Sequence, residues 1–409
     1  MRAFLAEHRY AVGPTVLSTA ASALSAAATL VVARQVGAEQ FGGYTVVLTV
    51  GGILLVLSQL SLNVVLYQEL PRRPAEEHPA LISTALALGL GLAVAVTLVA
   101  AVAGPALRAA FGVDAATLWW SVLFALSTGF ALLVEGVLRG RRQYVRVARL
   151  RLAAALLYLG AAAYGLLVLD RTGFGTYVGL LSASNLLFAA VALVGQPVRA
   201  GLVSRPLALR VLTHGGYVSV TAGLILLVFG LDVIVLNHAV APDVVGQYSI
   251  YNGFPKRLLG ILFSEGVGLV LLPTLAPLAK PELLRRVARI APLLGLAAAA
   301  VSFAAGAVLL GLLGPDYAYS PGLLGLAALG IGVHIVFNLY YFVLSVDGTR
   351  GAKVVIGCLL AGLPVTFAAQ VLLIGRYGLV GGLLAFIVTN AVLVALILAV
   401  TARVYRSPE

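Results

Sequence analysis

The chain has 409 residues, of which 61% are hydrophobic and only 10% are charged, and its formal net charge is +12. Soluble domains carry about 25% charged residues, so this chain has too few to cover a water-exposed surface. The composition excludes a soluble globular protein. It predicts an all-α integral membrane protein, because helices cross a bilayer without leaving backbone groups unpaired.

A spanning helix needs about 20 mostly apolar residues. Twelve such runs follow one another, separated by turn signals such as "GAEQFGG", "GPALRAAFGVD" and "GRYG". They cover residues 10–33, 43–67, 79–103, 117–138, 148–169, 175–195, 215–238, 246–272, 286–313, 321–345, 352–374 and 378–402. We therefore predict twelve transmembrane helices, the first of which is too long to be the apolar region of a signal peptide.

Lys and Arg are distributed unevenly over the predicted loops. The amino terminus, the even-numbered loops and the carboxyl terminus hold most of them, whereas the odd-numbered loops hold only Arg34, Arg108, Arg171 and Arg376. By the positive-inside rule, both termini of this multi-pass chain are predicted to lie in the cytoplasm, with the chain in the cell membrane. Topology and contacts with anionic lipids explain the basic excess, so no nucleic-acid partner is expected.

Two short stretches in the two halves of the chain are alike: "AEQFGGYTVV" and "APDVVGQYSI". A shift of 204 residues places Glu39 on Asp243, Gly42 on Gly246 and Tyr44 on Tyr248. Each stretch follows an odd-numbered span and opens an even-numbered one, so six spans repeat in the same orientation. We predict an N-lobe (1–200) and a C-lobe (201–409), related by a parallel repeat with a central cavity between them.

Two longer stretches carry a family resemblance. The pattern "LDVIVLNHAVAPDVVGQYSIY…LLP" resembles the seventh and eighth spans of Wzx-type oligosaccharide flippases, and "ASALSAAATLVVARQVGAEQFGGY" is similar to their first span. These flippases belong to the multidrug/oligosaccharidyl-lipid/polysaccharide exporter superfamily. The resemblance implies a V-shaped bundle. It also implies movement of a polyprenyl-pyrophosphate-linked oligosaccharide to the outer leaflet, for O-antigen, capsule or exopolysaccharide synthesis.

The segment "GFPKRLLGIL" places two cations inside the eighth predicted span. At about 1.5 Å per residue, Lys256 and Arg257 lie close to the midplane of the bilayer. Charges at that depth face the interior of a bundle or a wet cavity. Pro255 removes a backbone hydrogen bond and bends the helix. Asp232, in the seventh span, is predicted at the same depth.

Two hypotheses follow for these three charges, and they are compatible. In the first, Asp232 forms an ion pair with one cation and holds two helices in register. In the second, at least one cation stays free to bind a pyrophosphate, because guanidinium and ammonium groups bind phosphate strongly. We assign substrate binding to Lys256, Arg257, Asp232, Arg34 and Asn252.

Three further groups are weaker candidates. Glu265 and Asp232 are candidate ion-coupling residues. Arg139, Arg141 and Arg142 form a basic cluster at a predicted cytoplasmic entrance, where they would attract anionic lipid or a charged headgroup. Glu135 is close to this cluster in sequence, so we predict a local salt bridge with Arg139.

Other functions are less well supported by the residues. With a single cysteine and five scattered histidines, no metal site, cofactor or catalytic group is predicted. A cation-coupled multidrug exporter would favour an acidic cavity, and lipid II flippases usually have fourteen spans. A membrane glycosyltransferase or polymerase would need a larger loop or domain. We expect a monomer that works alongside glycan polymerase machinery and is not itself an enzyme.

Overall fold

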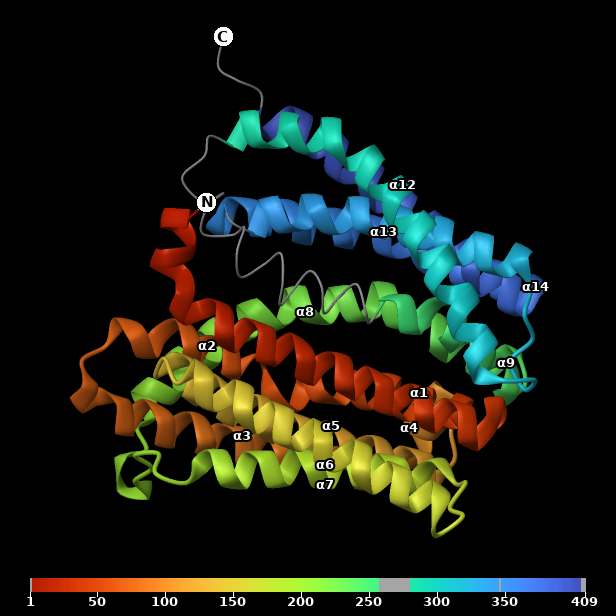
Figure 1. The fold of residues 1–409 in the computed structure, drawn as a ribbon. Helices are drawn as coiled ribbons and strands as arrows, with labels where there is room; N and C mark the ends of the chain where they lie inside the picture. The colour runs from red at the N-terminus through yellow and green to blue at the C-terminus, as the bar shows by residue number, and fades with distance from the viewer. Residues whose placement is uncertain (1, 257–279, 346, 406–409) are drawn as a thin grey trace. The chain divides into compact units, whose positions relative to one another are not determined.

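The computed structural model describes residues 2–256, 280–345 and 347–405, and the regular structure in these ranges is helical (Figure 1). The first half contains α1 (Arg2–Gln59), α2 (Leu62–Glu69), η1 (Leu70–Arg72), η2 (Ala75–Glu77), α3 (His78–Val102), α4 (Gly104–Phe111), α5 (Ala115–Gly140), α6 (Tyr144–Leu167), α7 (Phe174–Leu193) and η3 (Ala200–Leu202). The second half contains α8 (Arg205–Ala239), α9 (Pro242–Tyr248), η4 (Ser249–Gly253), α12 (Lys280–Leu313), α13 (Pro321–Ser345) and α14 (Gly348–Val404).

The predicted membrane character is confirmed. Within the described ranges, nine helical segments are long and apolar enough to cross a membrane. Two of these, in α1 and α14, each hold two predicted spans, because the helix is redirected partway along its length. The predicted span 246–272 begins with α9 and η4 and continues into residues outside the described ranges.

Two predicted loops are instead almost entirely helical. In "GAEQFGG" only Gly37 leaves the helical conformation, with φ 77° and ψ 171°, and in "GRYG" only Gly378 does, with φ 54° and ψ −124°. Side chains disfavour these backbone angles, whereas glycine adopts them freely. One glycine is therefore enough to redirect each helix, so each predicted turn separates two spans but is shorter than the sequence suggested. The "GPALRAAFGVD" segment likewise contains the short helix α4.

The second predicted span is broken in a way that the sequence did not indicate. Leu60 and Ser61, between α1 and α2, both have left-handed backbone angles, with φ 41° and 51°. The Ser219 hydroxyl of α8 donates to the Ser61 side chain at 2.9 Å. A Cβ on Gly215 of α8 would lie 2.3 Å from the Leu60 carbonyl oxygen, so α8 packs directly against this break.

The chain forms two compact units. Unit 1 consists of Met1–Gln35 and Val46–Gly223, and in it α7 packs against α5 and α6 (Figure 1). Unit 2 consists of Val36–Thr45 and Leu224–Glu409, and in it α13 packs against α12 and α14. Helix α8 contributes to both units. The predicted lobe boundary after residue 200 stays a prediction.

Unit 2 contains a reciprocal glycine contact that fits the predicted repeat. A Cβ on Gly42 would lie 2.0 Å from the Pro242 carbonyl oxygen, and a Cβ on Gly246 would lie 1.9 Å from the Ala38 carbonyl oxygen. The shift that aligns Gly42 with Gly246 also aligns Ala38 with Pro242. The two stretches therefore cross with equivalent residues in equivalent contacts, as a structural repeat requires.

Candidate functional site

Asp232 lies inside unit 2, near the carboxyl end of α8, and is only 2% exposed. Its Oδ1 accepts the Val233 backbone N–H at 2.8 Å. Its Oδ2 accepts the Tyr248 hydroxyl and lies 3.0 Å from the Lys256 ammonium nitrogen. This carboxylate therefore has three donors, of which one carries a full positive charge.

Lys256 lies three residues after η4, the turn that follows α9. Its Nζ lies 3.0 Å from Asp232 Oδ2 and 4.2 Å from the centre of the Phe386 ring, which gives it a cation–π contact as well as an ion pair. The Lys256 side chain is 17% exposed, against 3% for that of Asp232. The first hypothesis is therefore correct for these two residues: an ion pair joins the seventh and eighth predicted spans.

A polar stripe leads to the pair along one helix face. Tyr248, Asn252 and Lys256 are spaced four residues apart, which places them on one face of a helix. Asn252 is fully buried, and its Nδ2 donates to the Tyr248 hydroxyl oxygen. Asn252 Oδ1 is buried and finds no hydrogen-bond partner within the described ranges. The Tyr248 ring fits against α14 because Gly382 there has no side chain: a Cβ would lie 2.8 Å from the ring.

A π-helical turn, η4, lies within this stripe, where the sequence predicted only a proline bend. Proline has no N–H to donate, and its ring crowds the carbonyl four residues earlier in an α-helix. The wider π turn at Ser249–Gly253 ends just before Pro255 and accommodates this conflict. Single π turns occur frequently at functional sites. Here the turn also sets how Asn252 and Lys256 face α8.

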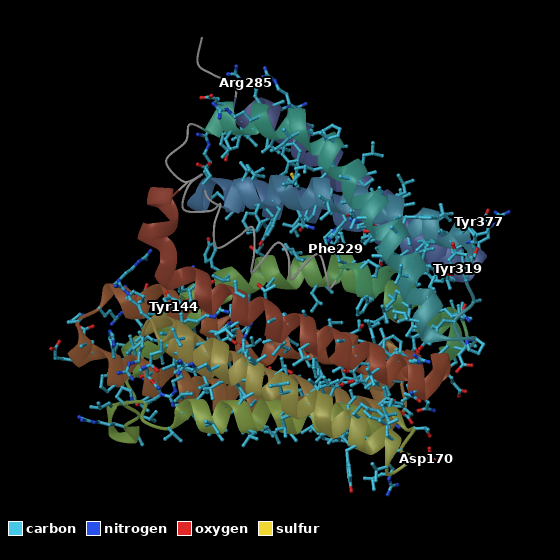
Figure 2. All side chains as sticks on the ribbon, in the orientation of Figure 1. Tyr144, Asp170, Phe229, Arg285, Tyr319 and Tyr377 are labelled. Carbon is cyan, nitrogen blue, oxygen red and sulfur yellow. The ribbon has the colours of Figure 1, made fainter. Side chains whose placement is uncertain are left out.

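An aromatic wall borders the pair on the side of α13 and α14. Phe229 of α8, labelled in Figure 2, contacts His334 edge-on, with 4.9 Å between ring centres. His334 also lies 5.4 Å from the Phe386 ring that faces Lys256. The Asn390 side-chain nitrogen donates to the Phe386 backbone carbonyl, which leaves Asn390 Oδ1 as an acceptor. His334 Nδ1 lies 2.9 Å from this oxygen, so it is the ring nitrogen that carries the hydrogen and donates.

The energetic consequence is that neither charge can be removed alone at little cost. Each buried ion loses several kcal/mol of hydration, and breaking such a pair costs about 3–5 kcal/mol because the remaining charge is uncompensated. Replacing both partners together is often nearly neutral. The burial of the Asp232–Lys256 ion pair is therefore only weak evidence that the pair serves to stabilise the fold.

The structure locates some of the predicted binding residues and not others. Asp232, Asn252 and Lys256 come together in one hydrogen-bonded network. Arg257 and Glu265 lie outside the described residues. Arg34 is exposed and belongs to unit 1, three residues before the break at Gly37.

The predicted basic cluster of unit 1 is mostly engaged within the protein. Glu135 is 6% exposed and lies between two cations, with Arg139 Nε at 2.6 Å and Arg151 Nε at 2.8 Å. The predicted Glu135–Arg139 salt bridge is therefore confirmed. Arg141 donates to the Gln196 side chain at 2.7 Å, and Arg142 is exposed in the left-handed turn after α5.

Sequence reasoning missed Tyr248 as the direct partner of Asp232, and it missed the aromatic wall. The four-residue spacing of Tyr248, Asn252 and Lys256 was the available signal. No comparable signal links Phe386 or Asn390 to Lys256, because they lie more than 100 residues away in sequence. In the described part of the chain, no group of three or more His, Cys, Asp or Glu residues could hold a metal ion.

Comparison with known proteins gives a family and a fold. The family model described as polysaccharide biosynthesis protein matches residues 13–278, which is more than half of the chain. Among curated proteins, none matches the sequence significantly.

Solved structures match over nearly the whole chain. An inward-facing multidrug resistance transporter of the MATE family and MOP superfamily has a TM-score of 0.68 and 17% identity, covering 94% of each chain. The lipid II flippase MurJ, in an inward closed conformation, has a TM-score of 0.66 and 11% identity, covering 97% of this chain and 88% of its own.

A third match is a MOP superfamily transporter from Pyrococcus furiosus, described as having a binding pocket of reverse polarity. It has a TM-score of 0.55 and 14% identity, and covers 96% of this chain and 94% of its own. At such identities these likenesses show a shared fold. This chain therefore belongs to the polysaccharide biosynthesis protein family, as a multi-pass membrane protein with the fold of MOP-superfamily transporters.

Proposed function

We propose that this protein is a flippase. Its cargo is an oligosaccharide linked to a polyprenyl pyrophosphate, which it moves from the cytoplasmic to the outer leaflet for cell-surface polysaccharide synthesis. The two lobes alternate access to a cationic cavity between them. The family match supports a role in polysaccharide synthesis, and the fold supports transport over catalysis.

One observation carries the choice of cargo: a lysine inside the helical bundle that pairs with one carboxylate among the described residues. A pyrophosphate needs its charge offset when it crosses the bilayer, and ammonium and guanidinium groups do this directly. Lys256 and the neighbouring Arg257 together outnumber Asp232 by one positive charge. This balance favours an anionic cargo and disfavours the cationic drugs that a multidrug exporter carries.

The remaining assignments are part of the same proposal. Arg34 and Asn252 contribute to cargo binding, and Arg139, Arg141 and Arg142 draw the headgroup or anionic lipids to the cytoplasmic entrance. Both termini lie in the cytoplasm. The protein acts as a monomer and passes its product to glycan polymerase machinery. Asp232 and Glu265 are the candidate ion-coupling groups.

The test is translocation in proteoliposomes loaded with a polyprenyl-pyrophosphate-linked oligosaccharide, read by lectin capture at the outer surface. The K256Q/R257Q double variant should lose at least about tenfold in rate, because each charge-assisted contact contributes roughly 1.5–3 kcal/mol. Lys353→Gln, an exposed cation on α14, is the matched control and should keep the wild-type rate.

Two outcomes would contradict this proposal. Undiminished translocation by K256Q/R257Q would exclude a role for these cations in binding the cargo. Transport of a cationic dye in place of the glycolipid, by the wild-type protein, would favour the multidrug exporter. Equal transport of lipid II and of unrelated lipid-linked glycans would agree with a polyprenyl-pyrophosphate cargo and would show that the protein does not select the sugar.

A further inference from the structure

The Asp232–Lys256 pair is asymmetric, and the asymmetry indicates which partner moves. Asp232 is fixed: its side chain is 3% exposed, and it keeps two donors, the Tyr248 hydroxyl and the Val233 N–H, when Lys256 leaves. Lys256 has one anionic partner in the described part of the chain, a flexible four-carbon stem and a side chain that is 17% exposed. An anionic group that reaches this site would therefore draw Lys256 away and leave Asp232 in place.

If Lys256 left, an ionised Asp232 would be a buried carboxylate without a counterion, which is unfavourable in free energy. A buried ion without a counterion loses several kcal/mol, and a carboxyl group in that position becomes neutral by taking up a proton. The Val233 N–H and the Tyr248 hydroxyl offset only part of this lost free energy, because neither donor carries a net charge.

The neighbouring side chains can satisfy Asp232 in both states. In the structure, Asn252 Nδ2 donates to the Tyr248 hydroxyl oxygen, and the Tyr248 hydroxyl donates to Asp232. A hydroxyl can both donate and accept, and an amide can present either its nitrogen or its oxygen. A neutral Asp232 can therefore donate to Tyr248, which in turn donates to Asn252 Oδ1, the buried acceptor that now has no partner within the described ranges.

Few other titratable groups face this carboxylate. From the elements packed around it, the described ones are Lys256 beyond η4, Tyr248 of α9 and His334 of α13. His334 is held in its aromatic pocket by Asn390. In the described ranges, α14 contributes the apolar Phe386 and Gly382 and the neutral Asn390 to these contacts.

We propose that Lys256 exchanges Asp232 for the pyrophosphate of the cargo, and that Asp232 takes up a proton as it does so. A hydronium ion or a buffer acid loses one proton as its own O–H or N–H bond breaks, and this proton forms a new O–H bond to an Asp232 carboxylate oxygen. Lys256 keeps its own protons. Cargo binding and proton binding are therefore linked. This inference rests on the proposed function and deepens it: the affinity of this site for the cargo depends on pH through the Asp232–Lys256 pair.

The experiment is calorimetric titration of the purified full-length protein in nanodiscs with geranylgeranyl pyrophosphate. Titrations in buffers of different ionisation enthalpy give the number of protons taken up. The wild type should take up about one proton more per bound probe than Asp232→Asn, since only the wild type has a carboxylate to neutralise. Asp232→Asn should still bind, and Asp232→Glu should restore the uptake. Asp243→Asn, an exposed carboxylate on α9, is the matched control.

A second measurement on the wild type covers the case in which Asp232→Asn does not fold. Infrared difference spectra should show a protonated-carboxyl band on addition of the probe, and the band should shift in Asp232→Glu. Binding with equal proton uptake in wild type and Asp232→Asn, or without the band, overturns the inference and leaves the proposed function standing. Failure of the wild type to bind the probe overturns both.

Discussion

The two stretches that the predicted repeat aligns share a reciprocal glycine contact but differ in charge. Under the shift that aligns Gly42 with Gly246, Asp232 corresponds to Ala28, Asn252 to Leu48 and Lys256 to Gly52. Ala28 is fully buried and apolar where Asp232 is buried and charged. The fold therefore forms at these positions without an ion pair. A charged pair in only one repeat fits a functional role better than a structural one, because an apolar replacement is available in the other repeat.

The largest expected effect concerns what the repeats share. Gly42→Ala and Gly246→Ala should each destabilise the protein by about 3 kcal/mol or more, the upper end of overpacking costs, because the new methyl would overlap a backbone carbonyl. Folded yield and melting temperature in detergent measure this. Gly357→Ala, on α14 with open space around it, is the control and should be neutral or slightly stabilising. Normal stability of either crossing variant would show that the reciprocal contact is looser than described.

The next effect concerns what the repeats do not share. Asp232→Asn alone should cost about 3 kcal/mol, because Lys256, whose side chain is only 17% exposed, loses the carboxylate that pairs with it. The double variant D232N/K256Q should recover most of that stability, since it makes the second repeat uncharged like the first. Thermal unfolding of the single and double variants decides whether the ion pair has a functional or a structural role. A double variant less stable than Asp232→Asn would mean that the fold needs the pair.

Unit 1 offers a smaller version of the same test. Glu135→Gln removes the carboxylate that pairs with Arg139 and Arg151, but their side chains are 31% and 25% exposed, so water compensates for part of the loss. We expect a cost of about 1 kcal/mol, above that of an exposed pair and below that of a buried one. Unfolding at low and high salt measures it. A loss as large as that of Asp232→Asn would remove the distinction between the two regions.

The smallest effect is a helix cap at the start of α5. Asp114 accepts the Thr117 backbone N–H at 2.7 Å, and the Thr117 side chain together with this bond lowers the pKa of the Asp114 carboxyl. Asp114→Ala should cost about 1 kcal/mol at neutral pH. Because the folded pKa is lowered, the gap between wild type and variant should close as the pH falls below about 4. A pH-independent gap would indicate that packing accounts for the effect.

Composition and apolar run length were enough to predict the helical membrane fold and most of the spans. They were not enough for the helix ends: Gly37 and Gly378 redirect helices that continue through predicted loops, because one residue with unusual backbone angles leaves no compositional trace. The Asp232–Lys256 pair could be predicted from equal depth in adjacent spans. The Phe386 contact could not, because it depends on how α14 packs in three dimensions.

The most direct measurement of the central claim compares two probes on two proteins. Geranylgeranyl pyrophosphate and the uncharged geranylgeraniol would be titrated into the wild type and into D232N/K256Q, both checked for normal folding. The wild type should prefer the pyrophosphate by at least about tenfold, a charge-assisted contact of roughly 1.5–3 kcal/mol, and the double variant should lose most of that preference. A double variant that still prefers the pyrophosphate as strongly as the wild type would contradict the account.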